Sequence, residues 1–114
     1  MDGVQRREFE RYRLWFPAQL ESNGGLRMAM THNIGAGGML MVFGAGLEVG
    51  ESVKVTFRLP SGEREQVVQG KVLRIEPNAE DPEGAWPLRV AIAFDEVDPE
   101  LAPVLQSAAD RFGA

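Results

Sequence analysis

The segment THNIGAGGMLMVF, residues 31–43, joins a polar residue and three glycines to a continuous apolar run. Asn33 leads into Gly35, Gly37 and Gly38, and the rest of the segment has the apolar character of a buried strand. Glycine gives the backbone conformational freedom and keeps side chains out of the way. Two interpretations follow: the chain merely turns here between two strands, or the turn presents its backbone amides to a ligand.

Apolar and polar residues alternate on both sides of this segment, and a period of two predicts half-buried strands. Six strands are expected in total, at residues 12–20, 26–33, 39–43, 53–59, 64–75 and 88–94. Asn23-Gly24-Gly25 predicts a tight hairpin turn between the first two strands, and Gly70 predicts a bulge in the fifth. In the second strand we expect Leu26, Met28 and Met30 to face the core.

The end of the chain changes to a helical period. Asp98 is a good N-cap, and Pro99 occupies the first helical position, where proline is accepted. A helix over residues 98–112 would cover an open end or edge of the sheet with its apolar face. The sequence therefore predicts one all-β domain over residues 1–114, a small antiparallel barrel or sandwich followed by an α-helix.

Composition excludes several classes of site. The 114 residues contain no cysteine and one histidine, His32, so disulfides, thiolate nucleophiles and zinc sites built on these residues are ruled out. The formal net charge of −5 argues against a polymer of nucleic acid as partner. Arginines nevertheless crowd the amino-terminal end, and a basic arm on an acidic body favours a small anionic partner.

We expect no enzyme, because no base stands beside a nucleophile and the carboxylates lie mainly in polar loops. The glycine segment precedes a strand and lacks the Lys-Ser/Thr of a phosphate loop. No metal site and no apolar run that could span a bilayer are expected, and the charged residues 1–13 do not resemble a signal peptide. The expected location is the cytoplasm.

The amino-terminal stretch QRREFERYRLWF, residues 5–16, places Arg7 and Arg11 four residues apart with Phe9 between them. The planar fork of arginine can pair with a guanine edge or with phosphate oxygens, and its face can stack on a base. Alternatively this is a charged terminus in which Glu8 and Glu10 satisfy the arginines.

The pair RREFER and NIGAGG, each followed by a strand, resembles the PilZ domain family, over essentially the whole chain. Arg7 and Arg11 match its RxxxR motif, and Arg6 matches the arginine often found just before it. Asn33 and Gly38 match its [D/N]xSxxG motif. The resemblance implies a six-stranded antiparallel split barrel over residues 12–97, a C-terminal helix over 98–112, and a flexible arginine-rich arm over 1–11.

The resemblance also implies binding of the bacterial second messenger cyclic di-GMP, with the site formed by Arg6, Arg7, Arg11, Asn33, Gly35 and Gly38. The arm would close over the nucleotide, become ordered, and relay the signal to a protein partner. One departure is that Gly35 replaces the serine of the motif, which removes one hydrogen bond, worth about 0.5–1.5 kcal/mol. The alternative is a degenerate module that acts through protein contacts alone, in motility or pilus machinery for example.

The sequence leaves open whether several residues near Asn33 contact the ligand or belong to the rest of the surface. Arg27 and Thr31 share the parity of Asn33, so they either extend the polar face toward the ligand or are neutral surface. His32 is expected on the opposite side of the strand, as a packed or edge histidine. Arg89, outward on the sixth strand, could line the same barrel surface.

The large apolar residues are assigned mainly to the core. The methionines at positions 28, 30, 39 and 41 alternate along strands, which indicates core filling. Trp15 and Trp86 fall outside the inward parity, so each either marks a partner surface or packs under the helix or a loop.

Overall fold

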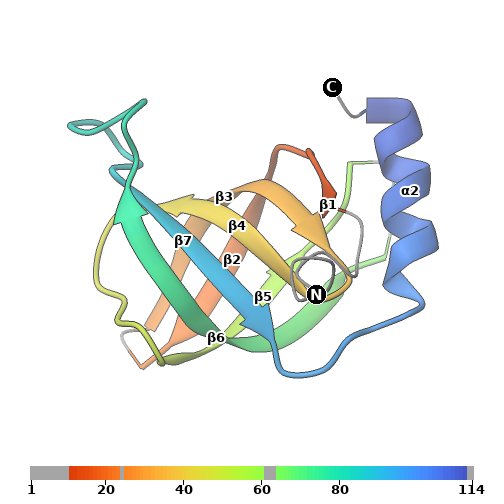
Figure 1. Cartoon of the computed structure of the whole chain (residues 1–114), viewed down its shortest axis with the longest axis horizontal. Helices are drawn as coiled ribbons and strands as arrows, with labels where there is room; N and C mark the ends of the chain where they lie inside the picture. The colour runs from red at the N-terminus through yellow and green to blue at the C-terminus, as the bar shows by residue number, and fades with distance from the viewer. Residues whose placement is uncertain (1–10, 24, 61–63, 113–114) are drawn as a thin grey trace, which may run out of the picture.

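The computed structural model describes residues 11–23, 25–60 and 64–112 (Figure 1). Within these ranges the chain forms seven strands and one helix. The elements are β1 (Arg11–Tyr12), β2 (Phe16–Ser22), β3 (Gly25–Gly35), β4 (Gly38–Phe43), β5 (Ser52–Phe57), β6 (Gln66–Pro77), β7 (Leu88–Phe94) and α2 (Leu101–Phe112).

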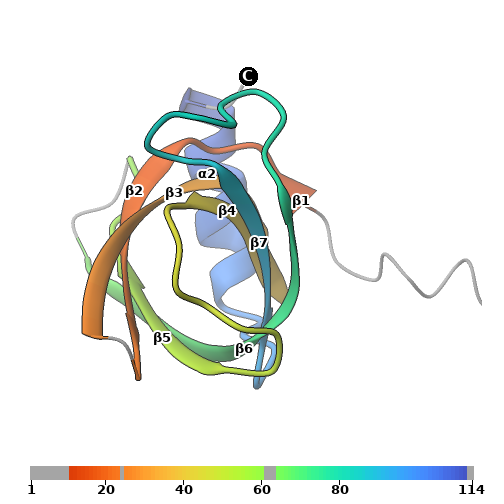
Figure 2. The same ribbon diagram turned by 90° about the vertical axis from the view of Figure 1, so that its left-hand side faces the viewer.

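Six of the strands close into an antiparallel barrel, in the order β3-β2-β5-β6-β7-β4 and back to β3 (Figure 2). Every barrel strand has a neighbour on both sides, although β3 pairs with β4 only from Met30 onward. This confirms the predicted all-β fold, a six-stranded antiparallel barrel with a C-terminal helix.

β1 is a short extension of the barrel wall. It pairs with β3 through Arg11 and Gly35 and through Tyr12 and Ile34. β4 occupies the other edge of β3 at Ile34, so β1 and β2 follow one another along the same edge. Three residues, Arg13 to Trp15, separate them, and the predicted first strand is therefore interrupted.

The faces of β3 differ from the prediction. Ala29 and Thr31 point into the barrel and are buried, whereas Leu26 and Met28 are more than half exposed. The large residues of the other strands already fill the interior, so the small residues of β3 are the ones that fit inside. The predicted inward parity of Leu26, Met28 and Met30 is wrong, and only the methionines of β4 fill the core.

A register shift between Thr31 and Asn33 explains why both ends of β3 cannot follow one parity. Thr31 pairs with Met41 and Asn33 pairs with Leu40, which leaves His32 as an extra residue. Such a bulge changes the side on which the following residues lie. Thr31 and Ile34 are both fully buried, and the two residues between them lie toward the outside.

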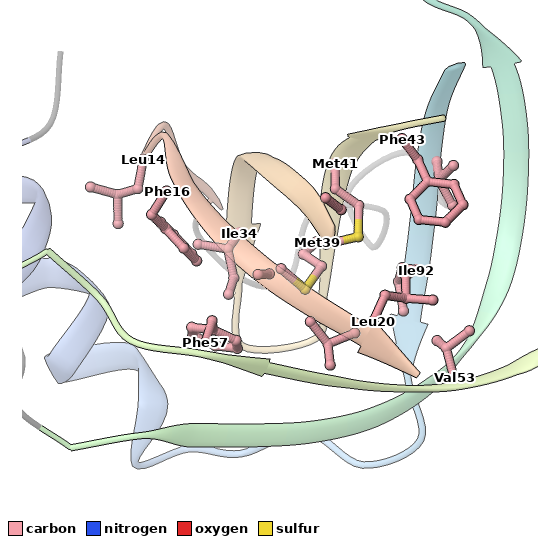
Figure 3. Close-up of a cluster of buried hydrophobic side chains, with 14 of the residues drawn as sticks. Leu14, Phe16, Leu20, Ile34, Met39, Met41, Phe43, Val53, Phe57 and Ile92 are labelled. Atoms are coloured by element: carbon pink, nitrogen blue, oxygen red, sulfur yellow. The ribbon is translucent and has the colours of Figure 1, made fainter. Parts of the chain in front are cut away.

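The core runs the length of the barrel and ends under α2 (Figure 3). Leu14, Phe16 and Phe57 lie toward the helix end of the cluster, and Phe43 lies toward the other end. In Figure 2 the helix lies behind the ring of strands. Leu101, Leu105 and Ala108 are its buried face, so α2 closes one opening of the barrel as predicted.

Two local signals had different outcomes. The N–H of Glu100 donates to the Asp98 carboxylate at 3.0 Å, but α2 begins at Leu101, so the expected helix start at residue 98 is too early. The expected bulge at Gly70 is absent: Gly70 pairs with Phe94, and the register shift of β6 falls between Val72 and Arg74. At Gly70 the backbones of β6 and β7 instead approach each other closely, because a Cβ there would overlap the main-chain oxygen of Ala93.

Candidate functional site

Arg11 and Asn33 are joined directly. The guanidinium of Arg11 donates from Nε at 3.0 Å and from Nη2 at 2.5 Å to the side-chain oxygen of Asn33. The pairing of Arg11 with Gly35 sets this geometry, because Asn33 is then the diagonal neighbour two residues along the same face. Two residues that are 22 positions apart in the chain thus form one polar unit.

The direction of this hydrogen bond determines what Asn33 presents. Its carbonyl oxygen accepts from Arg11, so its other terminal group, the amide NH₂, is a donor. Guanine O6 and N7 and phosphate oxygens are all acceptors. The unit of Arg11 and Asn33 is therefore a set of donors, which suits a ligand that carries acceptors and negative charge.

The bulge places His32 next to Asn33 on the outer surface. The imidazole of His32 contacts the indole of Trp15 edge-on, with ring centroids 6.4 Å apart. Burial lowers the pKa of His32 below its ordinary value, and the positive charges of Arg89 and Arg13 lower it further, while Glu80 opposes them. Arg89 and Arg13 therefore lie near His32, the residue beside Asn33.

The floor beside Asn33 is made of small and apolar residues. In the barrel wall Asn33 pairs with Leu40, Leu40 with Ala91, and Ala91 with Arg74, so these residues share the outer face. Strands lie about 4.8 Å apart, so the row from β3 to β6 spans about 14 Å. Arg74 ends the row and pairs with the Glu76 carboxylate at 2.9 Å. The row thus runs from the unit of Arg11 and Asn33 to the ion pair of Arg74 and Glu76.

Arg89 lies one row away, between Val42 of β4 and Glu76 of β6. It is half-buried on the outer side of β7 and close enough to His32 to affect the pKa of that residue. It therefore lines the barrel surface next to the site.

The glycines of the motif serve a different purpose from the one expected. Gly35 belongs to β3 and Gly38 to β4, and neither they nor Gly37 has a positive φ. The left-handed freedom of glycine is therefore not used in this turn. Gly38 is needed because a Cβ there would lie 2.5 Å from the main-chain oxygen of Ile92 in the neighbouring strand.

Two other predicted positions are corrected. Thr31 is fully buried, so it does not extend the polar surface. Arg27 is directed to the far end of β3, where it donates to the main-chain oxygens of Ala45 at 2.8 Å and Gly46 at 3.2 Å. Its guanidinium carbon also lies 5.2 Å from the ring centroid of Phe43. Arg27 thus ties the β2–β3 hairpin to the loop after β4, away from Asn33.

The structure brings four of the six predicted residues, Arg11, Asn33, Gly35 and Gly38, to the adjoining ends of β1, β3 and β4. The other two, Arg6 and Arg7, lie outside the described residues, as does the rest of the predicted arm before Arg11. No cluster of three or more metal-ligating side chains occurs among residues 11–23, 25–60 and 64–112. In the same part of the chain no helix is long and apolar enough to cross a membrane.

Comparison with known proteins identifies the family. The family model of the PilZ domain matches residues 5–109. No curated protein sequence matches the chain.

Solved structures of low sequence identity share the fold. MotI/DgrA, an inhibitor of motility from Bacillus subtilis, is 24% identical with a TM-score of 0.70, and the match covers 94% of this chain but only 51% of that one. The PilZ domain of YcgR from Escherichia coli, solved with c-di-GMP, is 16% identical with a TM-score of 0.67, over 90% of this chain and 87% of that chain. The PilZ domain of CeSA from a cellulose-synthesizing bacterium is 15% identical with a TM-score of 0.56, and the match covers 90% of this chain and 92% of that chain.

Proposed function

Because the chain belongs to the PilZ domain family, we propose that it is a non-catalytic receptor for cyclic di-GMP. The nucleotide would bind on the outer surface of the barrel beside Asn33, and the signal would pass to a protein partner in the cytoplasm. Support comes from the family match and from a structural neighbour, the PilZ domain of YcgR, that was solved with c-di-GMP.

The observation that carries the proposal is the hydrogen-bonded unit of Arg11 and Asn33. It joins the two family motifs, and it holds a guanidinium on the barrel wall at the start of β1. A guanidinium held in this way needs less ordering when it binds a phosphate or a guanine edge, so less conformational entropy is lost. Arg6 and Arg7 would supply further charge-assisted contacts from the arm, which would become ordered as they form.

Gly35 is the position that favours the second candidate, a PilZ-like interaction module that no longer binds the nucleotide. The family's serine would add a hydroxyl at this point, and glycine lacks it. One neutral hydrogen bond contributes about 0.5–1.5 kcal/mol, which is at most about tenfold in affinity. We therefore expect Gly35 to weaken nucleotide binding without abolishing it.

Titration calorimetry with cyclic di-GMP tests the proposal. Each charge-assisted hydrogen bond contributes about 1.5–3 kcal/mol, so Arg11→Ala should weaken binding by about 10- to 150-fold. Arg7→Ala should have an effect of the same order. Arg64→Ala is the matched control, because it removes the same charge before β6, outside the strands that carry Asn33, and it should leave the affinity unchanged.

The two candidates give opposite results. Heat from the wild type that disappears in the Arg7 and Arg11 variants, with circular dichroism unchanged, supports the receptor. Absence of heat at high micromolar nucleotide supports the degenerate module. Equal affinity for wild type and Arg11→Ala would mean that a nucleotide binds somewhere other than the proposed surface.

A further inference from the structure

Large apolar side chains gather on the outer face of the β2–β3 hairpin. Leu26 is 61% exposed, Met28 51% and Trp15 57%. They share one face of the sheet with Pro17 and Met30, because Pro17 pairs with Met30 and Gln19 with Met28. We call Trp15, Pro17, Leu26, Met28 and Met30 the hairpin stripe.

The hairpin stripe has no element of the described chain over it. Figure 2 shows the β2–β3 wall at the left side of the barrel and α2 at the far opening. β2 pairs with β3 and, over residues 18–21, with β5, whereas β3 pairs with β4 only from Met30 onward. A partner that lies on this face, rather than along the edge of β3 before Met30, must bind through side chains.

The dimensions of the hairpin stripe fit one helix. From the Trp15–His32 contact to the pair of Glu21 and Leu26 it extends over about six residues, or about 20 Å. Two strands are about 10 Å wide with their side chains, which is close to the diameter of an α-helix. A helix of about 13 residues has the same length. The footprint is about 200 Å², far below the roughly 800 Å² per partner of a standard interface, so it does not favour a stable dimer of this chain.

The rim of the hairpin stripe is polar and unequally charged. At the Trp15 end, Arg13 and Arg89 lie near enough to His32 to lower its pKa, and one opposing charge, that of Glu80, lies there too. At the Leu26 end, Glu21 pairs with Lys54 at 3.7 Å, which leaves little net charge. Exposed tryptophan and methionine side chains are enriched at protein-binding surfaces, and the polar residues of this face are Gln19, opposite Met28, and Glu21, opposite Leu26. The excess positive charge at one end favours a partner with carboxylates there.

We propose that the hairpin stripe binds an amphipathic α-helix of a partner protein, with its apolar face on Met28 and Leu26 and its carboxylates at the Arg13 and Arg89 end. This inference names the class of partner for the relay in the proposed function. Its evidence is the exposed face itself, so the test uses no nucleotide. Its failure would leave cyclic di-GMP binding untouched, and the reverse also holds.

The test uses a designed 18-residue helical peptide with leucine and phenylalanine along one face and two glutamates at one end. Amide chemical shifts of the isotope-labelled full chain are followed by NMR as the peptide is added. We expect shifts confined to β2, β3 and the Arg13–Trp15 segment. A scrambled peptide of the same composition, which lacks an apolar face, should cause none.

Variants separate apolar contact from charge. Met28→Lys adds a positive charge that attracts this acidic peptide, so weaker binding can only come from lost apolar contact. We expect the affinity for the peptide to fall by about tenfold, or 1.4 kcal/mol. Val67→Lys on β6 is the matched control, because Val67 is 52% exposed and Met28 is 51% exposed. Leu26→Lys gives a second variant with the same expected loss. Both side chains point to solvent, so the melting temperature should be close to that of the wild type.

Four results would overturn the proposal. They are unchanged affinity in both hairpin variants, an equal loss in Val67→Lys, shifts on another face, or no shifts at millimolar peptide. If a peptide with lysines in place of the glutamates binds equally well, the assigned charge preference is wrong. Concentration-dependent self-association that Met28→Lys abolishes would make a second copy the occupant. If deletion of residues 1–10 makes the peptide bind much more tightly, then the chain's own amino-terminal segment competes for the hairpin stripe and is its occupant.

Discussion

Gly38 begins β4, and its position against β7 predicts the result of adding a single methyl group. Gly38 pairs with Ala93, and a Cβ built on it would lie 2.5 Å from the main-chain oxygen of Ile92. No flexible side chain is involved, so one of the two strands must shift. The backbone at Gly38 has no positive φ, and alanine could otherwise adopt its conformation. The close approach alone therefore accounts for the glycine.

The expected cost of Gly38→Ala follows from two opposing terms. Overpacking a well-packed interior costs about 1–3 kcal/mol. Replacing glycine by alanine restricts the unfolded chain and returns about 0.4–1 kcal/mol. The net loss should be about 1–2 kcal/mol in the free energy of unfolding. With an unfolding entropy of about 2.1 cal/mol/K per residue, a loss of 1.5 kcal/mol in a 114-residue chain lowers Tm by about 6 °C.

Thermal and urea unfolding followed by circular dichroism measure this loss, and Gly44→Ala is the control. A Cβ at Gly44 would meet the main-chain oxygen of Ala85 at 3.8 Å, which is ordinary contact, and Gly44 also has no positive φ. Its Tm should therefore stay constant or rise. If Gly38→Ala is as stable as Gly44→Ala but binds cyclic di-GMP poorly, the glycine serves the ligand and the packing argument is wrong.

Further predictions concern the ligand and the single histidine. Gly35→Ser should tighten cyclic di-GMP binding by up to about tenfold in calorimetry, and weaker binding would contradict the account of that position. Asn33→Ala removes the acceptor of Arg11 and the NH₂ donor together, so it should weaken binding by about tenfold or more. An NMR titration of the His32 ring should show a pKa below 6.5 that rises in Arg89→Ala and rises when the anionic nucleotide binds; no movement on binding would place the nucleotide elsewhere. Because the pKa of His32 is lowered on folding, its contribution to stability is complete above about pH 6.5 and declines as the pH falls toward the folded-state pKa, and His32→Gln should lack this decline in urea unfolding.

The architecture could be predicted because its signals are local and repeated. Alternation, turn residues and a capped amphipathic helix gave six strands and a terminal helix in the correct order. The Arg11–Asn33 contact, by contrast, joins residues far apart in the chain, and only the pair of family motifs placed them together. Nothing in the spacing of Arg11 alone indicates that it pairs opposite Gly35.

The faces of β3 could not be predicted, because two features of this strand oppose the simple pattern. A strand with methionines at alternate positions is expected to bury them, yet here Ala29 and Thr31 are the residues that fit between the large side chains of the other strands. The extra residue at His32 then shifts the parity, so that both His32 and Asn33 lie toward the outside. Parity arguments fail at a bulge, and the site begins at one.

The same bulge explains how one wall of the barrel can carry two kinds of surface. On one side of it, Asn33 joins Arg11 and leads to a floor of small residues. On the other side, His32 contacts Trp15 and leads to the apolar hairpin stripe. Arg11 and Trp15 are connected by only three residues: Tyr12 pairs with Ile34 of β3, and Arg13 and Leu14 lie between β1 and β2. A ligand that draws on Arg11 thus acts on the short segment that also positions Trp15, so a nucleotide site and a partner surface at these places would be coupled through the main chain rather than through the barrel core.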